Sequence, residues 1–276
     1  MKLLQTMPFV ILASITLLTS CKNDDKKKEP EMKQPKLKEE TVTYKLDSST
    51  RNNFVVYDEN IEGKRPAVLI IHEWWGLNDY AKMRARELAK LGYIAMAVDM
   101  YGDNKMGDDP GAAEKLAGPF YMKPETAKPI FDAALNKLKE FEQTDATKVA
   151  AIGYCFGGAQ VINLAKMGEE LKGVVSFHGN LAVMPPSKDL TKAPILVCHG
   201  AIDEYVPKTE VEIFKKQMDS VGAKYTVKVY EGATHSFTNP NATAMGEKFK
   251  LSVAYNAAAD TASWKDMKDF FHQIFQ

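Results

Sequence analysis

Apolar runs and segments of helical periodicity alternate along the chain. Residues 67–72, AVLIIH, form a continuous apolar run, which is typical of a strand that is covered on both faces. In the next segment, residues 79–93, apolar side chains recur at helical spacing, at Tyr80, Met83, Leu88 and Leu91. The pattern therefore predicts a buried strand followed directly by an amphipathic helix.

The same alternation continues to the end of the chain. Residues 94–100 predict the next buried strand, helical stretches extend from about residue 112 to 141, and later strands are predicted at 148–154, 173–179, 194–200 and 225–231. This order predicts an α/β fold with a mainly parallel sheet and helices on both faces. The functional loops of such a sheet lie at the carboxyl ends of its strands. No linker or repeat divides residues 41–276, so we expect one domain there.

An N-terminal β-hairpin is predicted before the first parallel strand. The strings TVTYKL and NFVVYD are rich in β-branched and aromatic residues, as strands are. The residues DSSTRNN between them are polar and predict the turn.

The first 20 residues have the pattern of a targeting signal. Lys2 provides a basic flank, an apolar run extends from Pro8 to Leu18, and small residues precede Cys21. The run is too short to span a bilayer. The string LLTSC resembles a bacterial lipoprotein signal, which implies removal of residues 1–20 and lipidation of Cys21. An ordinary secretory peptide that is cut nearby is the alternative.

Residues 21–40 are crowded with charge and proline, which predicts a flexible tether. A lipidated Cys21 would hold the domain at a bacterial cell envelope, on the periplasmic or surface face of the outer membrane. We expect the lipid anchor to be the only contact with the membrane.

Composition narrows the classes of function. The chain is 45% hydrophobic, which is enough for a globular core, and 36 basic residues balance 36 acidic ones. A net charge of zero gives no field that attracts nucleic acid, so we expect no nucleic-acid partner. No zinc-protease, paired-cysteine, Walker or dinucleotide motif occurs, so we expect neither a metal nor a cofactor. Cys155 and Cys198 are expected to be free thiols.

The stretch GYCFGG, residues 153–158, has the spacing of a nucleophile elbow, G-x-S-x-G, with Cys155 in place of serine. Such a strand-to-helix turn exposes the side chain above the sheet and aims the positive end of a helix at it, which favours a thiolate. It also leaves the backbone N–H of Phe156 free to donate to an oxyanion. A phosphate-binding turn or simple tight packing is the alternative.

A thiol nucleophile needs a base, and the base needs an orienting carboxylate. Asp203 follows the predicted strand 194–200, and His235 follows the predicted strand 225–231. The order Cys155, Asp203, His235 matches that of α/β-hydrolases. The alternatives are a helix-capping role for Asp203 and His178 as a reserve base.

Several motifs together resemble the dienelactone hydrolase family, in the family's order: HEWWGL, VDMYG, GYCFGG, HGAIDEYVP and HSF. The resemblance extends from about residue 46 to the end and implies an α/β-hydrolase fold with a cysteine nucleophile. It also implies that Glu73 interacts with the resting thiol and helps to form the thiolate when substrate enters. The backbone N–H of Trp74 would be the second oxyanion donor.

The sequence departs from the family's type enzyme at two positions. Members that hydrolyse anionic lactones carry arginines where this chain has Asp103 and Asn239. Because a guanidinium recognises a carboxylate and an aspartate repels it, we expect that anionic dienelactone is not preferred. Shifted loops would be needed to bring Arg84, Arg86 or Lys105 into the pocket.

The expected activity is hydrolysis of a small carboxylic ester or lactone through the triad and an acyl-enzyme. We expect Tyr101, Trp75 and Phe237 to contact the substrate, with Trp74 and Tyr121 nearby. Two alternatives remain open: a non-catalytic surface lipoprotein that binds a ligand in the same pocket, and an acyltransferase or peptidase on the same fold.

Overall fold

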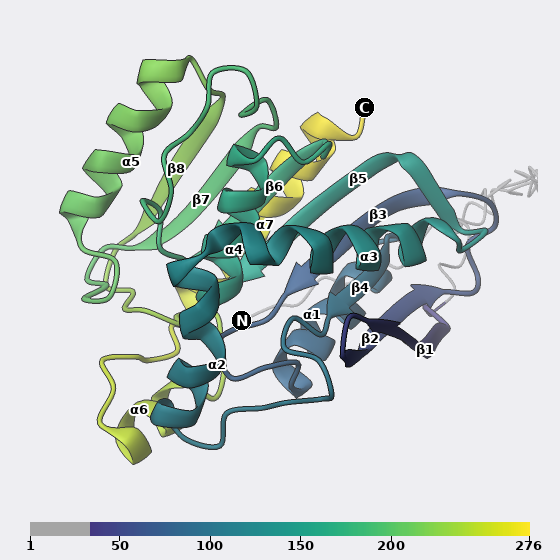
Figure 1. Cartoon of the computed structure of the whole chain (residues 1–276), viewed down its shortest axis with the longest axis horizontal. Coiled ribbons are helices and arrows are strands. Elements are labelled where there is room, and N and C mark those ends of the chain that lie inside the picture. Colours follow the sequence, from purple (N-terminus) through teal and green to yellow (C-terminus); the bar gives the residue numbers. More distant parts are fainter. Residues whose placement is uncertain (1–33) are drawn as a thin grey trace, which may run out of the picture. The chain divides into compact units, whose positions relative to one another are not determined.

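The computed structural model describes residues 34–276, and residues 35–276 form one unit. Its eight strands make a single sheet in the order β1-β2-β4-β3-β5-β6-β7-β8. The strands are β1 (Leu37–Leu46), β2 (Ser49–Asp58), β3 (Arg65–Ile71), β4 (Ile94–Val98), β5 (Thr144–Tyr154), β6 (Gly173–Phe177), β7 (Ile195–Gly200) and β8 (Tyr225–Tyr230). The hairpin β1–β2 is antiparallel and joins β4 in antiparallel fashion, whereas the strands from β4 to β8 run parallel (Figure 1). The prediction of a mainly parallel sheet with an N-terminal hairpin is confirmed.

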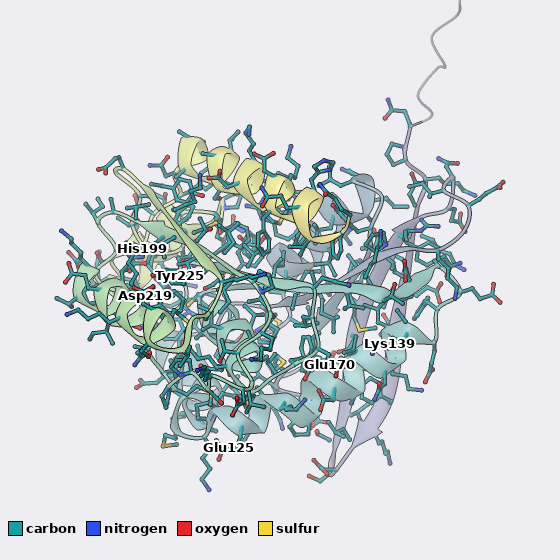
Figure 2. All side chains as sticks on the ribbon, turned by 90° about the horizontal axis from the view of Figure 1, so that it is seen from above. Glu125, Lys139, Glu170, His199, Asp219 and Tyr225 are labelled. Carbon is teal, nitrogen blue, oxygen red and sulfur yellow. The ribbon has the colours of Figure 1, made fainter. Side chains whose placement is uncertain are left out.

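Helices cover both faces of the sheet. They are α1 (Asp79–Lys90), α2 (Pro110–Met122), the 3₁₀ turn η1 (Pro124–Thr126), α3 (Ala127–Lys139), α4 (Phe156–Lys166), α5 (Lys208–Val221), α6 (Ala242–Phe249) and α7 (Ala257–Ile274). Leu69 of β3 belongs to a hydrophobic cluster that includes residues of α3, α4 and α5, and its neighbour Val68 belongs to a second cluster that includes residues of α1 and α7. In Figure 2, α7 lies on one side of the sheet and α3 on the other. Cover on both faces explains why β3 is an uninterrupted apolar run.

Local sequence signals set the ends of several helices. The side chain of Asn78 accepts a hydrogen bond from the backbone N–H of Ala81 and caps α1. Asp109 caps α2 and Asn256 caps α7 in the same way. Gly222 ends α5 in the left-handed conformation, with φ of 66°. None of the helices in residues 34–276 is long and apolar enough to cross a membrane.

The predicted hairpin turn is wrong, because the turn is much shorter than seven residues. The strands are joined at Asp47 and Ser48, with Asp47 at φ of 52°, and β2 already begins at Ser49. Polar residues can lie inside this strand because they find partners. Arg51 is buried and donates to the carbonyl oxygens of Asp99 and Met100, at 3.2 and 2.7 Å.

One other predicted boundary changes. Strand β1 begins at Leu37, so residues 37–40 belong to the sheet and not to the tether. The helical stretches predicted from about 112 to 141 are α2, η1 and α3, and Pro124 starts a new turn between the two α-helices. The signal sequence, Cys21 and most of the tether lie outside the described residues.

Candidate active site

Cys155 lies in a sharp turn between β5 and α4. Its backbone has φ of 52° and ψ of −113°, a combination that residues with a side chain rarely adopt. The turn is tight enough to require glycine on both sides. A Cβ atom on Gly153 would lie 2.0 Å from the carbonyl oxygen of Gly157, and one on Gly157 would lie 2.1 Å from that of Ile71. The sequence spacing therefore forms the elbow that it predicts.

The end of β3 lies beside this elbow. The backbone N–H of Gly157 donates to the carbonyl oxygen of His72 at 3.0 Å, so residues 72–74 adjoin the turn. Tyr101 donates its hydroxyl hydrogen to the carbonyl oxygen of Trp74 at 3.0 Å and holds this segment. In the described part of the chain, the backbone N–H groups of Trp74 and Phe156 have no acceptor. They are available to a ligand oxygen at Cys155.

Asp203 and His235 are in contact, although they come from different strand ends. The His235 ring nitrogen Nδ1 lies 2.9 Å from Asp203 Oδ2, and both side chains are buried. The other carboxylate oxygen, Oδ1, accepts the backbone N–H groups of Tyr205 and Val206 at 2.9 and 3.0 Å. Asp203 is not the cap of α5, because Pro207 occupies that position. One oxygen of Asp203 thus orients the imidazole ring, and the backbone holds the carboxylate in place through the other oxygen.

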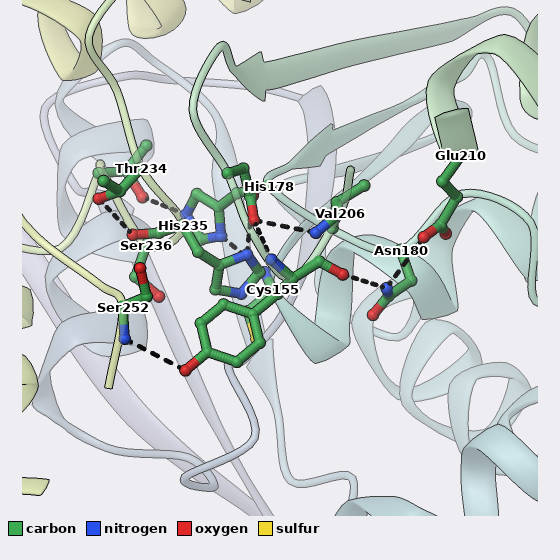
Figure 3. Close-up of polar contacts among 12 residues, drawn as sticks. Cys155, His178, Asn180, Val206, Glu210, Thr234, His235, Ser236 and Ser252 are labelled. Carbon is green, nitrogen blue, oxygen red and sulfur yellow. Dashed lines mark hydrogen bonds and ion pairs between the residues drawn. The ribbon is translucent and has the colours of Figure 1, made fainter. Parts of the chain in front are cut away.

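In Figure 3, Cys155 and His235 belong to the same group of side chains, and both line one cavity. Burial lowers the pKa of His235, but the Cys155 sulfur and the hydrogen bond to Asp203 outweigh it and raise this pKa well above 6.5. An imidazole between a carboxylate and a thiol can take up the thiol proton and leave a thiolate.

His178, the reserve base, has another set of partners. Its Nδ1 accepts the backbone N–H of Cys155 at 3.1 Å, so the ring proton is on Nε2, which lies 2.7 Å from Thr238 Oγ1. Thr238 Oγ1 is also 2.6 Å from the Tyr80 hydroxyl, and Arg84 donates to the Thr238 carbonyl oxygen at 2.6 Å. Burial lowers the pKa of His178 well below its usual value. A neutral His178 therefore stabilises the nucleophile turn by accepting a hydrogen bond from its backbone.

The Glu73 carboxylate is buried and is held by two neutral donors. Ser236 Oγ donates to Oε1 at 3.1 Å, and Asn239 Nδ2 donates to Oε2 at 2.6 Å. Burial raises the pKa of Glu73, although both hydrogen bonds act against this rise. Within residues 34–276, no hydrogen bond joins this carboxylate to Cys155. Glu73 and Cys155 both line the cavity, and the interaction of Glu73 with the thiol that the resemblance implies stays a prediction.

None of the candidate cations reaches the site. Arg84 is held beneath it by Thr238 and Asp260, Arg86 pairs with Glu39, and Lys105 pairs with Asp103. Asp103 is exposed and accepts the backbone N–H of Thr50, so it faces the hairpin and does not repel a ligand in the site.

A cavity of about 950 Å³ opens over these residues. It is lined by Glu73, Trp74, Trp75, Gly111, Glu114, Lys115, Ala117, Gly118, Pro119, Tyr121, Met122, Cys155, Asn180, Tyr205, His235, Ser236, Asn239, Ala242, Met245, Leu251 and Val253. No arginine is among the described residues that line it. Its size is at the upper end of the range for small-molecule sites.

Two of the residues expected to contact substrate lie elsewhere. Trp75 lines the cavity, but Phe237 is fully buried behind the site and packs edge-on against His178. Tyr101 is also buried and is absent from the lining, because its ring packs against His72. Aromatic residues near the motifs are therefore divided between cavity wall and core.

Three polar residues of the site make hydrogen bonds that the sequence did not predict, although Asn239 was noted for the arginine that it replaces. Ser236 and Asn239 hold Glu73, and Thr238 holds His178. All three belong to the stretch HSFTN that also carries His235. The sequence signal for these roles is the cluster of hydrogen-bonding side chains directly after His235. In the described residues, no three His, Cys, Asp or Glu side chains are grouped so that they could hold a metal ion.

Comparison with known proteins identifies the family. Residues 53–275 match the dienelactone hydrolase family. Protein usf of Aquifex pyrophilus is 32% identical over 196 residues, which cover 69% of this chain and 84% of that protein. A dienelactone hydrolase-like promiscuous phosphotriesterase from metagenomic libraries superposes with a TM-score of 0.81 and 34% identity, over 87% of this chain and 99% of its own.

A second solved structure, m3DLH, superposes equally well. Its TM-score is 0.81 at 32% identity, and the match covers 87% of this chain and 99% of that one. Both superpositions extend over nearly the whole length of the solved structures. The chain therefore belongs to the dienelactone hydrolase family, and it is a hydrolase with the α/β-hydrolase fold.

Proposed function

We propose that the protein hydrolyses uncharged carboxylic esters or lactones through Cys155, His235 and Asp203. The observation that carries the proposal is the contact of Asp203 with His235, together with the position of Cys155 and His235 on the wall of the same 950 Å³ cavity. A buried imidazole held by a carboxylate on one nitrogen has its other nitrogen directed at the nucleophile. The described lining contains no arginine, and its charged residues Glu73, Glu114 and Lys115 give no excess of positive charge, which supports an uncharged substrate.

The reaction follows from these positions. Cys155 attacks the carbonyl carbon as a thiolate, and the negative charge that develops on the carbonyl oxygen is stabilised by the N–H groups of Phe156 and Trp74. The imidazolium of His235 gives its proton to the leaving alkoxide, and a thioester with Cys155 remains. Neutral His235 then takes a proton from water, whose oxygen attacks the thioester and releases the acid. Asp203 keeps the ring oriented throughout.

Glu73 has a different part in this scheme from the one that the resemblance implies. Ser236 and Asn239 already hold its carboxylate, so the proton of the Cys155 thiol is assigned to His235. Glu73→Gln should therefore lower kcat by less than about 100-fold, the smallest factor that a general acid or base contributes. His235→Asn should lower it by about 1000-fold or more. An equal loss of kcat in both variants would contradict this assignment and indicate that Glu73 takes the thiol proton.

The experiment that tests the function uses the purified domain and a panel of aryl esters, neutral lactones and anionic lactones. Wild-type protein should hydrolyse the uncharged substrates, Cys155→Ala should not, and the mass of a quenched reaction should show one acyl group on Cys155. Binding without turnover in both proteins would favour the ligand-binding alternative. Transfer of the acyl group to added alcohols or cleavage of amides would favour an acyltransferase or peptidase. A preference for anionic lactones would contradict the proposed substrate charge.

We also propose that Cys21 carries a lipid that anchors the domain to a bacterial cell envelope. The proposal is supported by the LLTSC string and the charged stretch that follows it. Radiolabelled palmitate supplied to cells that express the protein should label wild type but not Cys21→Ser. Equal labelling of both, or release of wild type from membranes by salt alone, would contradict the anchor.

A further inference from the structure

Helix α2 contributes more of the cavity lining than any other helix. Its lining residues are Gly111, Glu114, Lys115, Ala117, Gly118, Pro119, Tyr121 and Met122. Glu114 and Lys115 carry opposite charges, and the remaining side chains of this group are small or apolar. Met122 at the end of the helix is 78% exposed although it is apolar, and it lies where the cavity meets solvent. We call this surface the α2 wall.

Gly118 has no conformational reason to be glycine. It lies in the interior of α2, its φ is not in the left-handed region, and a Cβ atom added to it would meet no heavy atom within 4 Å. Gly153 and Gly157 differ, because their Cβ atoms would meet backbone at 2.0 and 2.1 Å. Glycine is the least favourable residue in a helix interior after proline, and Pro119 is its neighbour. Two residues that disfavour a helix therefore stand together on the cavity wall, where they keep space open.

We infer that the α2 wall binds a bulky, apolar and uncharged part of the substrate, and that Gly118 determines how large this part can be. The inference rests on the proposed function, because the cavity that α2 lines is the one that contains Cys155 and His235. The cavity lining also includes the apolar side chains of Met245, Leu251 and Val253, which follow α2 in the chain. The substrate class is then uncharged esters or lactones with an extended alkyl or aryl group, and not short acyl esters.

The test is a series of 4-nitrophenyl esters from acetate to octanoate. Wild-type kcat/KM should rise at least about tenfold along the series, because each buried methylene adds to transition-state binding. Gly118→Leu should lower the ratio of octanoate to acetate kcat/KM by about tenfold or more, since its side chain fills the space. Ala112→Leu is the matched control, because Ala112 belongs to α2 but does not line the cavity, and it should keep the wild-type ratio.

Equal kcat/KM for acetate and octanoate in wild type, or an unchanged ratio in Gly118→Leu, would overturn the inference. A failure of the proposed function itself is distinguished by binding. In the Cys155→Ala background, 4-nitrophenyl octyl ether should quench tryptophan fluorescence at lower concentration than the ethyl ether, because Trp74 and Trp75 line the cavity. Adding Gly118→Leu should abolish the octyl preference, and adding Ala112→Leu should preserve it. Equal affinity for both ethers would overturn the inference whether or not the protein hydrolyses esters.

Discussion

At the scale of single residues, His178 shows how a second histidine near a triad can serve the structure. Its two ring nitrogens are both occupied, one by the Cys155 backbone and one by Thr238. The Thr238 hydroxyl is in turn hydrogen-bonded to the Tyr80 hydroxyl. The Arg84 guanidinium also donates a hydrogen bond to that Tyr80 hydroxyl. The chain of contacts connects α1 with the nucleophile turn through buried polar groups that have partners.

Thr238→Val should destabilise the protein by about 1–3 kcal/mol, because the valine leaves the His178 Nε2–H without an acceptor in a buried site. Thr238→Ser keeps the hydroxyl and removes only a methyl group, so its loss should be about 1 kcal/mol or less. Urea denaturation of both variants measures the difference. If both lose the same stability, the hydroxyl bonds contribute nothing to the fold.

His72 gives a pH dependence to stability. It is fully buried, its Nδ1–H donates to the Glu73 carbonyl oxygen at 2.5 Å, and burial lowers its pKa to about 4 from 6.5. Between pH 6.5 and pH 4, His72 therefore takes up a proton in the unfolded chain but not in the folded chain. The stability from a neutral His72 is present above pH 6.5 and is lost as the pH falls towards 4, by about 3 kcal/mol.

Urea denaturation at pH 7.5 and pH 4 tests this dependence. In His72→Leu the stability lost between the two pH values should be smaller than in wild type by up to about 3 kcal/mol. His272→Leu is the matched control, because His272 is exposed on α7, and its loss should equal that of wild type. A pH dependence unchanged by His72→Leu would show that this histidine takes up its proton equally in both states.

The positions of Cys155, Asp203 and His235 were predictable, because each follows a strand and their order is that of the fold. The partners of Glu73 were not. Ser236 and Asn239 are separated from it by 163 and 166 positions in the chain. No local pattern shows which donor a buried carboxylate meets once the loops have packed.

At the scale of elements, the nucleophile turn depends on backbone contact between β5, α4 and the end of β3. Gly157→Ala should cost more than about 3 kcal/mol or prevent folding, because its Cβ would lie 2.1 Å from a carbonyl oxygen of Ile71 that the sheet holds in place. Gly118→Ala is the matched control, and it should raise stability by up to about 1 kcal/mol, since its Cβ has space. Thermal unfolding followed by circular dichroism measures both. Equal stability of the two variants would contradict the packing of the turn.

The hairpin shows why elements were easier to predict than their ends. Both strands were predicted, but residues 49–53 of the predicted turn belong to β2, where Arg51 and Asn53 are buried. Asn53 pairs with the backbone of Asp99 at 2.8 Å, and Arg51 reaches the same loop. These partners come from the segment after β4, so polar residues that suggest a turn locally are satisfied only by the assembled sheet.

At the scale of the whole molecule, the alternation of strands and helices was enough to predict the fold class and the edge of the sheet that carries the site. The order of strands was not predictable from alternation alone. Strand β3 lies between β4 and β5, which brings Trp74 and Glu73 beside Cys155. Which helices cover which face likewise depends on this order.

The residues of the core and of the site all belong to the unit 35–276. A protein that begins at Gln34 should therefore have the same melting temperature and the same kcat/KM as one that begins at residue 22. Differential scanning calorimetry and ester hydrolysis measure the two quantities. A lower melting temperature of the shorter protein would show that residues 22–33 stabilise the domain.

The loop HSFTN, residues 235–239, carries several residues of the site within five positions of the chain. Within residues 235–239 it carries His235, both donors to Glu73, and the partner of His178. Substitutions in it should be strongly epistatic, because a shift that suits one contact displaces the others. An evolutionary path to a new substrate charge would then have to replace the loop together with Glu73. For the same reason, grafting the whole loop from a relative should succeed more often than exchanging its residues one at a time.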